Sequence, residues 1–227
     1  MSNTKAKGEA GVSKKFKVLC CHGFLQDGDS FRSKLASVRG RLKSRVSEFI
    51  FVDAPISVSA DAATRTIGAP VAGGLSWWSV PEPPEPDSFD RSFEVLRDAV
   101  VAHQPDGLMG FSQGASSVAL LLAKLQRTDP DLVAGIRFVV LFAGFPPTHE
   151  DWEGELSGLP PHIRSLHVMG AKDDIITPDH SRRLVKQFKL AAGPESTETL
   201  MHDGGHMVPS AKGEIAQRLR GFVDASS

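Results

Sequence analysis

Short apolar runs alternate along the chain with longer stretches in which apolar residues recur every three or four positions. The short runs are rich in β-branched residues, and most have too few polar positions for a solvent-facing side. This pattern is typical of strands that are buried on both faces of a parallel sheet. We predict six strands, over Phe16–His22, Glu48–Pro55, Asp106–Ser112, Ile136–Phe145, Ile163–Asp173 and Ser196–Gly204.

The stretches between these runs have helical periodicity. Phe89, Phe93 and Leu96 share one face of a predicted helix, and Ser88 is placed to cap its N-terminus. The alternation of strands and helices predicts an α/β fold with a doubly wound, mostly parallel sheet flanked by helices. The predicted helices are Ser30–Lys43, Ser88–His103, Gln113–Arg127, Pro178–Lys189 and Ala211–Asp224.

Two segments depart from the alternation. Residues 56–87 contain several glycines, Trp77, Trp78 and the proline-rich PEPPEP at 81–86, so we expect a long, lid-like excursion from the sheet. A shorter excursion, residues 146–161, follows the fourth predicted strand.

Length and composition fit a single α/β domain over residues 16–227, because 227 residues with 41% hydrophobic content can bury one sizeable core. Residues 1–15 lack the apolar segment of a secretory signal and are expected to form a flexible tail. No apolar run reaches the roughly 18 residues of a membrane span. The adjacent Cys20 and Cys21 would point to opposite faces of a strand, so no disulfide is expected and a reducing, cytoplasmic location is predicted.

The net charge of −1 argues against a nucleic acid partner, because phosphate-backbone binding needs a broad basic surface. Nothing in the composition fixes the oligomeric state.

A serine between two glycines marks the junction of a predicted strand and a predicted helix. Gly110, Ser112 and Gly114 match the pattern G-x-S-x-G, which has meaning only in this strand–turn–helix context. The glycines would let the two backbones approach, and the tight turn would expose the serine hydroxyl. We therefore predict Ser112 as a nucleophile; the competing interpretation is an ordinary turn with Ser112 as helix N-cap.

A serine nucleophile needs an imidazole base and a carboxylate that holds the imidazole. Asp173 and Asp174 follow a predicted strand, and His206 lies in a glycine-rich loop after the last predicted strand, so the order serine–acid–histidine fits. We favour Asp173 as the acid, with Asp174 forming the local turn, although either could cap the next helix.

His202 competes with His206 as the base but lies within or at the end of the strand. His202 and His206 have two glycines among the three residues between them and are not a helical metal pair, so we predict no metal and no cofactor.

The transition state also needs backbone donors. The amide of Gln113, at the start of a predicted helix, and the amide of Phe24, after the first predicted strand, are the expected oxyanion donors. His22 is interpreted as a hydrogen-bonded organiser of that loop. Trp77, Trp78 and Phe145 are candidate substrate-binding residues, with the alternative that a tryptophan only packs the excursion onto the body.

Several segments together resemble the FSH-type serine hydrolases, a branch of the α/β-hydrolase superfamily close to acyl-protein thioesterases and small carboxylesterases. The segments are HGFLQDGDSF, the pair of tryptophans, GFSQGA, GAKDDIITP and GGHMVP, and the resemblance extends from about Phe16 to the last predicted helix.

The resemblance implies an α/β-hydrolase fold without a large cap domain and a metal-independent hydrolase with Ser112, Asp173 and His206 as its triad. The implied partner is a small-molecule acyl ester or thioester, cleaved through an acyl-enzyme. The acid loop has one residue more than the commonest family pattern, which leaves Asp174 open as the acid. A catalytically silent ligand-binding or interaction protein on the same scaffold is the alternative, because function lies in the site and not in the fold.

Overall fold

The computed structural model describes residues 15–79, 87–147 and 150–226. Its main sheet has six parallel strands in the order β2-β1-β5-β6-β7-β8, which confirms the predicted parallel sheet. All six predicted strands are present; five lie within the predicted bounds, and the second begins two residues earlier and ends three residues earlier than predicted. They are β1 Phe16–Cys21, β2 Val46–Val52, β5 Gly107–Phe111, β6 Phe138–Phe142, β7 Arg164–Gly170 and β8 Thr197–His202.

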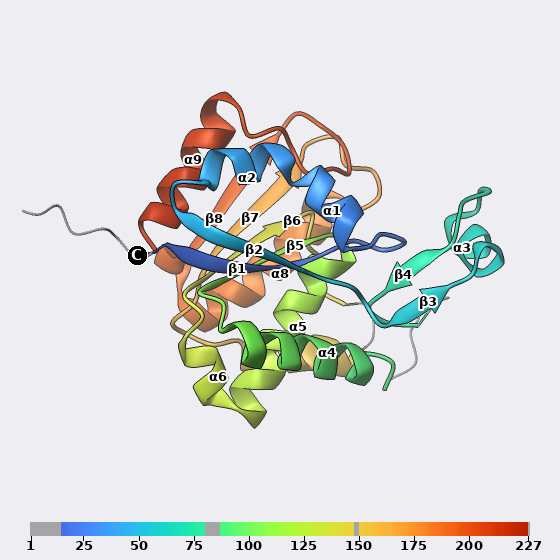
Figure 1. Ribbon diagram of the computed structural model, residues 1–227, viewed down its shortest axis with the longest axis horizontal. Helices are drawn as coiled ribbons and strands as arrows, with labels where there is room; N and C mark the ends of the chain where they lie inside the picture. The colour runs from blue at the N-terminus through green and yellow to red at the C-terminus, as the bar shows by residue number, and fades with distance from the viewer. Residues whose placement is uncertain (1–14, 80–86, 148–149, 227) are drawn as a thin grey trace, which may run out of the picture.

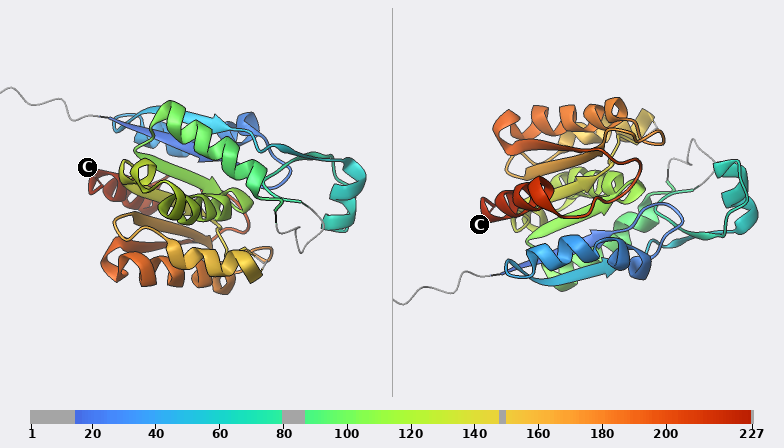
Figure 2. Two further views of the ribbon diagram at one scale, coloured as in Figure 1. Left: turned by 90° about the horizontal axis from the view of Figure 1, so that it is seen from below. Right: turned by 90° about the horizontal axis from the view of Figure 1, so that it is seen from above.

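Helices cover both faces of this sheet (Figures 1 and 2). One face carries α1 (Gly28–Lys34), α2 (Ala36–Leu42) and α9 (Gly213–Asp224). The other face carries the longer α4 (Asp90–His103), α5 (Gln113–Thr128) and α8 (Pro178–Ala192), with the short α6 (Pro130–Ala134) and α7 (Glu150–Glu155) beside them. Single 3-10 turns lie at Leu156–Gly158 and Pro194–Ser196.

The central strand β6 shows why the apolar runs are continuous. Val139 and Leu141 pack into the core on the α5 side, whereas Phe138, Val140 and Phe142 pack into the core on the α9 side. Because successive side chains of a strand point to opposite faces, both sets must be apolar.

Two helix predictions need correction, one in its continuity and one in its N-cap residue, whereas the other three predicted helices differ only at their ends. The predicted helix Ser30–Lys43 is two helices, because the buried Leu35 leaves helical geometry with φ −80° and ψ 1°. This change of direction keeps Phe31 and Val38 buried against the same face of the sheet. The predicted helix Ser88–His103 begins at Asp90 in the structure, with Phe89 rather than Ser88 at its N-cap position.

The excursion contains a small second sheet. Strands β3 (Ile56–Val58) and β4 (Gly74–Ser76) pair antiparallel, and α3 (Ala60–Ile67) connects them. This unit projects from the body at the end of the molecule opposite the C-terminus (Figures 1 and 2). The proline-rich 81–86 lies outside the described residues, as does the predicted tail except for Lys15.

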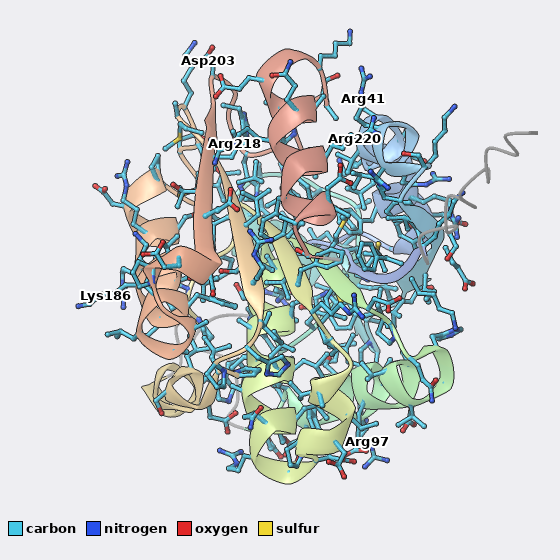
Figure 3. The ribbon with its side chains drawn as sticks, turned by 90° about the vertical axis from the view of Figure 1, so that its left-hand side faces the viewer. Arg41, Arg97, Lys186, Asp203, Arg218 and Arg220 are labelled. Carbon is cyan, nitrogen blue, oxygen red and sulfur yellow. The ribbon has the colours of Figure 1, made fainter. Side chains whose placement is uncertain are left out.

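Charged side chains such as Arg97, Lys186 and Asp203 lie at the periphery of the molecule (Figure 3). Across the described ranges, none of the helices combines the length and the apolar character that crossing a lipid bilayer demands.

Candidate active site

The strand–turn–helix motif around Ser112 has the geometry that its glycines predict. Ser112 links β5 to α5 with φ 53° and ψ −122°, a conformation that is rare for a residue with a side chain. A Cβ on Gly110 would lie 2.5 Å from the carbonyl oxygen of Gly114, and a Cβ on Gly114 would lie 2.3 Å from the carbonyl oxygens of Cys21 and His22. Only glycine fits at these two positions.

The structure brings Ser112, His206 and Asp173 into one hydrogen-bonded chain. The Ser112 Oγ lies 2.9 Å from His206 Nε2, and His206 Nδ1 lies 2.8 Å from Asp173 Oδ2. A carboxylate only accepts hydrogen bonds, so Nδ1 carries the proton and Nε2 of the neutral ring is free to accept from the serine hydroxyl. Ser112 makes no side-chain cap on α5, in contrast to the N-cap interpretation.

Asp173, and not Asp174, faces His206. The Asp173 side chain is 1% exposed, and its Oδ1 accepts from the N–H groups of Ile175 and Ile176 at 3.1 and 2.8 Å. The Asp173 carboxylate therefore binds both the histidine and the backbone of the bend in which Asp174 itself lies. Asp174 is exposed, and the cap of α8 is Thr177, whose Oγ1 accepts from the N–H of His180 at 3.3 Å.

His202 is buried at the end of β8, close to the loop that carries His206. Its Nδ1 accepts from the N–H of Gly204 at 3.2 Å, and burial lowers its pKa. The Gly204 carbonyl in turn accepts from the N–H of Lys172 at 3.0 Å, so the histidine loop is tied to the acid loop. His202 therefore supports the loop that carries His206.

The two predicted oxyanion donors lie on the segments that follow β1 and β5, which are neighbouring strands of the sheet. The amide of Gln113 is the first of α5, where N–H groups have no intrahelical acceptor. Phe24 lies in the loop after β1, which His22 braces: its Nε2 accepts from the N–H of Ala54 at 3.0 Å and its Nδ1–H donates to the carbonyl of Gly23 at 2.8 Å. Burial lowers the pKa of His22, which favours the neutral ring that this bonding requires.

Sequence reasoning missed the polar contacts that join the excursion to this site. The Gln113 side-chain oxygen accepts from the N–H of Trp77 at 3.0 Å, and its amide nitrogen donates to Ser76 Oγ at 3.0 Å. The Trp77 indole N–H donates to the carbonyl of His22 at 2.8 Å. No periodicity or motif signals such contacts, because each partner comes from a different element.

The three candidate substrate-binding residues are buried. Trp77 is 0% exposed, Trp78 is 1% exposed and Phe145 is 7% exposed. Trp78 packs edge-on against Phe145 at a ring distance of 6.4 Å and also against the rings of Phe89 and Trp152. Contact of these rings with a substrate stays a prediction, since packing of the excursion onto the body accounts for their positions.

A hollow of about 340 Å³ adjoins His206. A larger hollow of about 680 Å³ lies between α2 and β2, away from Ser112 and His206, and includes Arg39 and Phe49 in its lining. Within the described part of the chain, no cluster of three or more His, Cys, Asp or Glu side chains is arranged to hold a metal ion.

Known structures share this architecture. Arabidopsis thaliana SOBER1 superposes with a TM-score of 0.64 at 15% identity, over 94% of this chain and 99% of that chain. The Bacillus cereus carboxylesterase has a TM-score of 0.62 at 16% identity, with 94% and 89% covered, and Zea mays acyl-protein thioesterase 2 has 0.60 at 16%, with 93% and 94% covered. At this identity the likeness shows the fold alone, which is the α/β-hydrolase fold.

Sequence relatives carry the comparison further. Esterase OVCA2 of Danio rerio is 33% identical over 221 residues, which cover 86% of this chain and 91% of the relative. Esterase OVCA2 of Homo sapiens is 31% identical, with 94% and 97% covered. The family model described as serine hydrolase (FSH1) matches residues 12–218, so the chain belongs to the FSH1 serine hydrolase family.

Proposed function

We propose that this protein hydrolyses carboxylic esters or acyl thioesters of small molecules through an acyl-enzyme on Ser112. The observation that carries the proposal is the hydrogen-bonded chain from Ser112 through His206 to Asp173, with distances of 2.9 and 2.8 Å. Membership of a serine hydrolase family and relatives named as esterases support the same chemistry.

The reaction follows from the direction of the hydrogen bonds. His206 Nε2 takes the proton of Ser112 as Oγ attacks the substrate carbonyl, and Asp173 stabilises the imidazolium that forms. His206 then gives this proton to the departing alcohol or thiol, which leaves the acyl group on Ser112. Water, deprotonated by the same imidazole, attacks the acyl-enzyme, and the acid is released as Ser112 regains its proton.

The amides of Gln113 and Phe24 are proposed to donate to the oxyanion of each tetrahedral intermediate. The Gln113 amide lies at the positive end of α5, where the helix dipole favours negative charge. A donor of this kind contributes about 3 kcal/mol of transition-state stabilisation. Trp77, Trp78 and Phe145 are proposed to lie on the acyl side of the substrate, which would require movement of the buried rings.

Labelling with a fluorophosphonate probe tests the activity directly. The wild-type protein is expected to be labelled in a single site, and the Ser112→Ala variant is expected to lose the label. Thermal unfolding of both proteins controls for folding. An unlabelled wild-type protein with a normal unfolding transition would favour a ligand-binding or interaction protein on the same scaffold.

Substrate comparison then separates the two ester classes. Hydrolysis of p-nitrophenyl esters and of acyl-CoA thioesters, each over a series of acyl chain lengths, gives kcat/KM for both classes. The class with the higher value at its best chain length identifies the preferred chemistry, and the series measures how long an acyl chain the site accepts.

A further inference from the structure

The hollow beside His206 is lined by apolar side chains and by side chains that donate hydrogen bonds. Three of its residues are apolar, two carry nitrogen donors, and the sixth is the histidine itself; they are Phe111, Met207, Val208, Gln26, Lys34 and His206. None of the lining residues that the structure describes is a carboxylate. A hollow of this kind suits a ligand part that is apolar on one side and accepts hydrogen bonds on the other.

Lys34 supplies a positive charge at the rim of this hollow. It is the last residue of α1, which lies over the end of the sheet nearest the excursion (Figure 1). Among residues 15–79, 87–147 and 150–226, Lys34 makes no ion pair, whereas its helix neighbour Arg32 pairs with Asp29 at 3.8 Å. The Lys34 ammonium is therefore available to an external anion.

Gln26 adds an oriented donor to the same hollow. Its side-chain oxygen accepts from the N–H of Gly23 at 3.3 Å, and because that N–H can only donate, the amide oxygen must face it. The amide nitrogen of Gln26 therefore remains available as a donor, because it has no hydrogen-bond partner within the described part of the chain. The hollow thus offers an N–H donor and an ammonium together.

The position beside His206 indicates which part of a substrate enters this hollow. In acyl transfer the imidazole must hand its proton to the departing oxygen or sulfur, so the leaving group has to lie against the histidine. The ring of His206 is flanked by that of Phe111 at 4.9 Å, which provides an apolar surface for such a group. A volume of about 340 Å³ exceeds the roughly 150 Å³ that accommodates a benzene ring.

We propose that this hollow receives the leaving group of the substrate and that Lys34 and Gln26 bind an anionic oxygen group on it, a carboxylate or a phosphate. The proposal rests on the hydrolase activity proposed above. It names a substrate class, esters or thioesters whose alcohol or thiol part is anionic, with Lys34 as the residue that determines this specificity.

Three esters with the same acyl group test the proposal. In 4-(butanoyloxy)benzoate the leaving phenol carries a carboxylate, in 4-(butanoyloxy)benzamide it carries a neutral amide of the same shape, and in 4-(butanoyloxy)phenyl phosphate it carries a phosphate. The measured quantity is the ratio of kcat/KM for each anionic ester to kcat/KM for the neutral ester. Differences in leaving-group acidity cancel when this ratio is compared between variants.

In Lys34→Gln the anionic-to-neutral ratio is expected to fall about two- to fivefold, the size of a partly exposed ion pair. Lys34→Arg should keep the ratio, and Lys34→Glu should lower it further. Added sodium chloride should lower the ratio of the wild type but not that of Lys34→Gln, because salt screens an exposed charge pair. Whichever anionic ester loses its advantage, benzoate or phosphate, identifies the anion that the hollow prefers.

Lys186→Gln is the matched control, since it removes the same charge from the exposed face of α8 (Figure 3). Its ratio should equal that of the wild type. An equal ratio in the wild type and Lys34→Gln, with both proteins hydrolysing the neutral ester and labelled by fluorophosphonate, would overturn the assignment of this hollow while leaving the hydrolase proposal intact. Absence of both hydrolysis and labelling would instead refute the activity itself.

Discussion

At the scale of single residues, Ser112 combines backbone strain with a specific set of contacts. A non-glycine residue at φ 53° and ψ −122° costs about 1–3 kcal/mol and persists only where its surroundings enforce it. The Ser112 N–H donates to the carbonyl of Phe142 at 2.8 Å, and its hydroxyl meets His206. The strain thus falls on the residue that the proposed mechanism uses as nucleophile, and it orients the hydroxyl before any substrate arrives.

The two adjacent aspartates allow a residue-scale test. Asp173→Asn should lower kcat by about 10⁴, because an amide facing His206 Nδ1 can stabilise the wrong tautomer. Asp174→Asn should change kcat less than about threefold, since the Asp174 side chain is exposed. Steady-state hydrolysis of a p-nitrophenyl ester by both variants measures the difference.

These variants control for each other, because each replaces one carboxylate by an amide in the same loop. Circular dichroism verifies that Asp173→Asn folds, as expected because the asparagine oxygen can still accept from the N–H groups of Ile175 and Ile176. The opposite ranking of the two kcat values would transfer the role of the acid to Asp174.

At the scale of elements, the start of α5 lies so close to the end of β1 that we expect a side chain at Gly114 to destabilise the protein. Gly114→Ala should lower the free energy of unfolding by about 1–3 kcal/mol, because the new Cβ would lie 2.3 Å from the carbonyl oxygens of Cys21 and His22. Urea denaturation followed by tryptophan fluorescence gives this free energy for the variant and the wild type.

Gly221→Ala is the matched control for this substitution. Gly221 lies within α9, and a Cβ there would meet nothing within 4 Å. The alanine should therefore stabilise the protein by up to about 1 kcal/mol through its higher helix propensity. A destabilisation of similar size in both variants would show that close approach of the backbones is not the reason for glycine at 114.

The main sheet could be predicted from the sequence because its central strands β5 and β6 are buried on both faces. The runs around Gly107–Phe111 and Phe138–Phe142 are apolar without interruption, and this signal needs no knowledge of neighbours. Strands β3 and β4 escaped prediction, since each has only three residues and is specified mainly by its partner. The break at Leu35 was equally invisible, because both halves have good helical periodicity.

The candidate site divides in the same way. Ser112, Asp173 and His206 could be named from motif and chain order, because each follows a recognisable strand. The role of Gln113 as a side-chain bridge to Ser76 depends on how the excursion packs, which local sequence does not encode. Lys34 carries no sequence signal either, since an exposed lysine in the last turn of a helix is ordinary.

At the scale of the whole molecule, a buried histidine links stability to pH. Burial lowers the pKa of His167 from 6.5 to about 3, so the folded protein holds this ring neutral. Below pH 6.5 the His167 ring is protonated in the unfolded chain, whereas in the folded chain it stays neutral down to about pH 3. The free energy of unfolding therefore decreases as the pH is lowered from 6.5 to about 3. Between pH 7 and pH 5 the loss from this residue alone should be about 2 kcal/mol.

Urea denaturation of His167→Leu at several pH values measures this contribution. The variant should lose less stability than the wild type on acidification, so the gap between the two should change by about 2 kcal/mol from pH 7 to pH 5. Phe188→Leu is the control, because Phe188 packs against the His167 ring at 5.0 Å and has no titratable group. Parallel pH profiles for the wild type and His167→Leu would contradict the prediction.

The excursion has an outlying tip and a root, and the two differ in how tightly they are attached. At the root, the N–H of Leu25 donates to the carbonyl of Leu75 at 2.9 Å, and a Cβ on Gly74 would lie 2.5 Å from the carbonyl oxygen of Leu25. The tip, α3, stands clear of the main sheet (Figure 2). An engineer can therefore exchange the tip, but a graft that replaced residues 74–78 would also remodel the loop after β1, which carries Phe24, a proposed oxyanion donor.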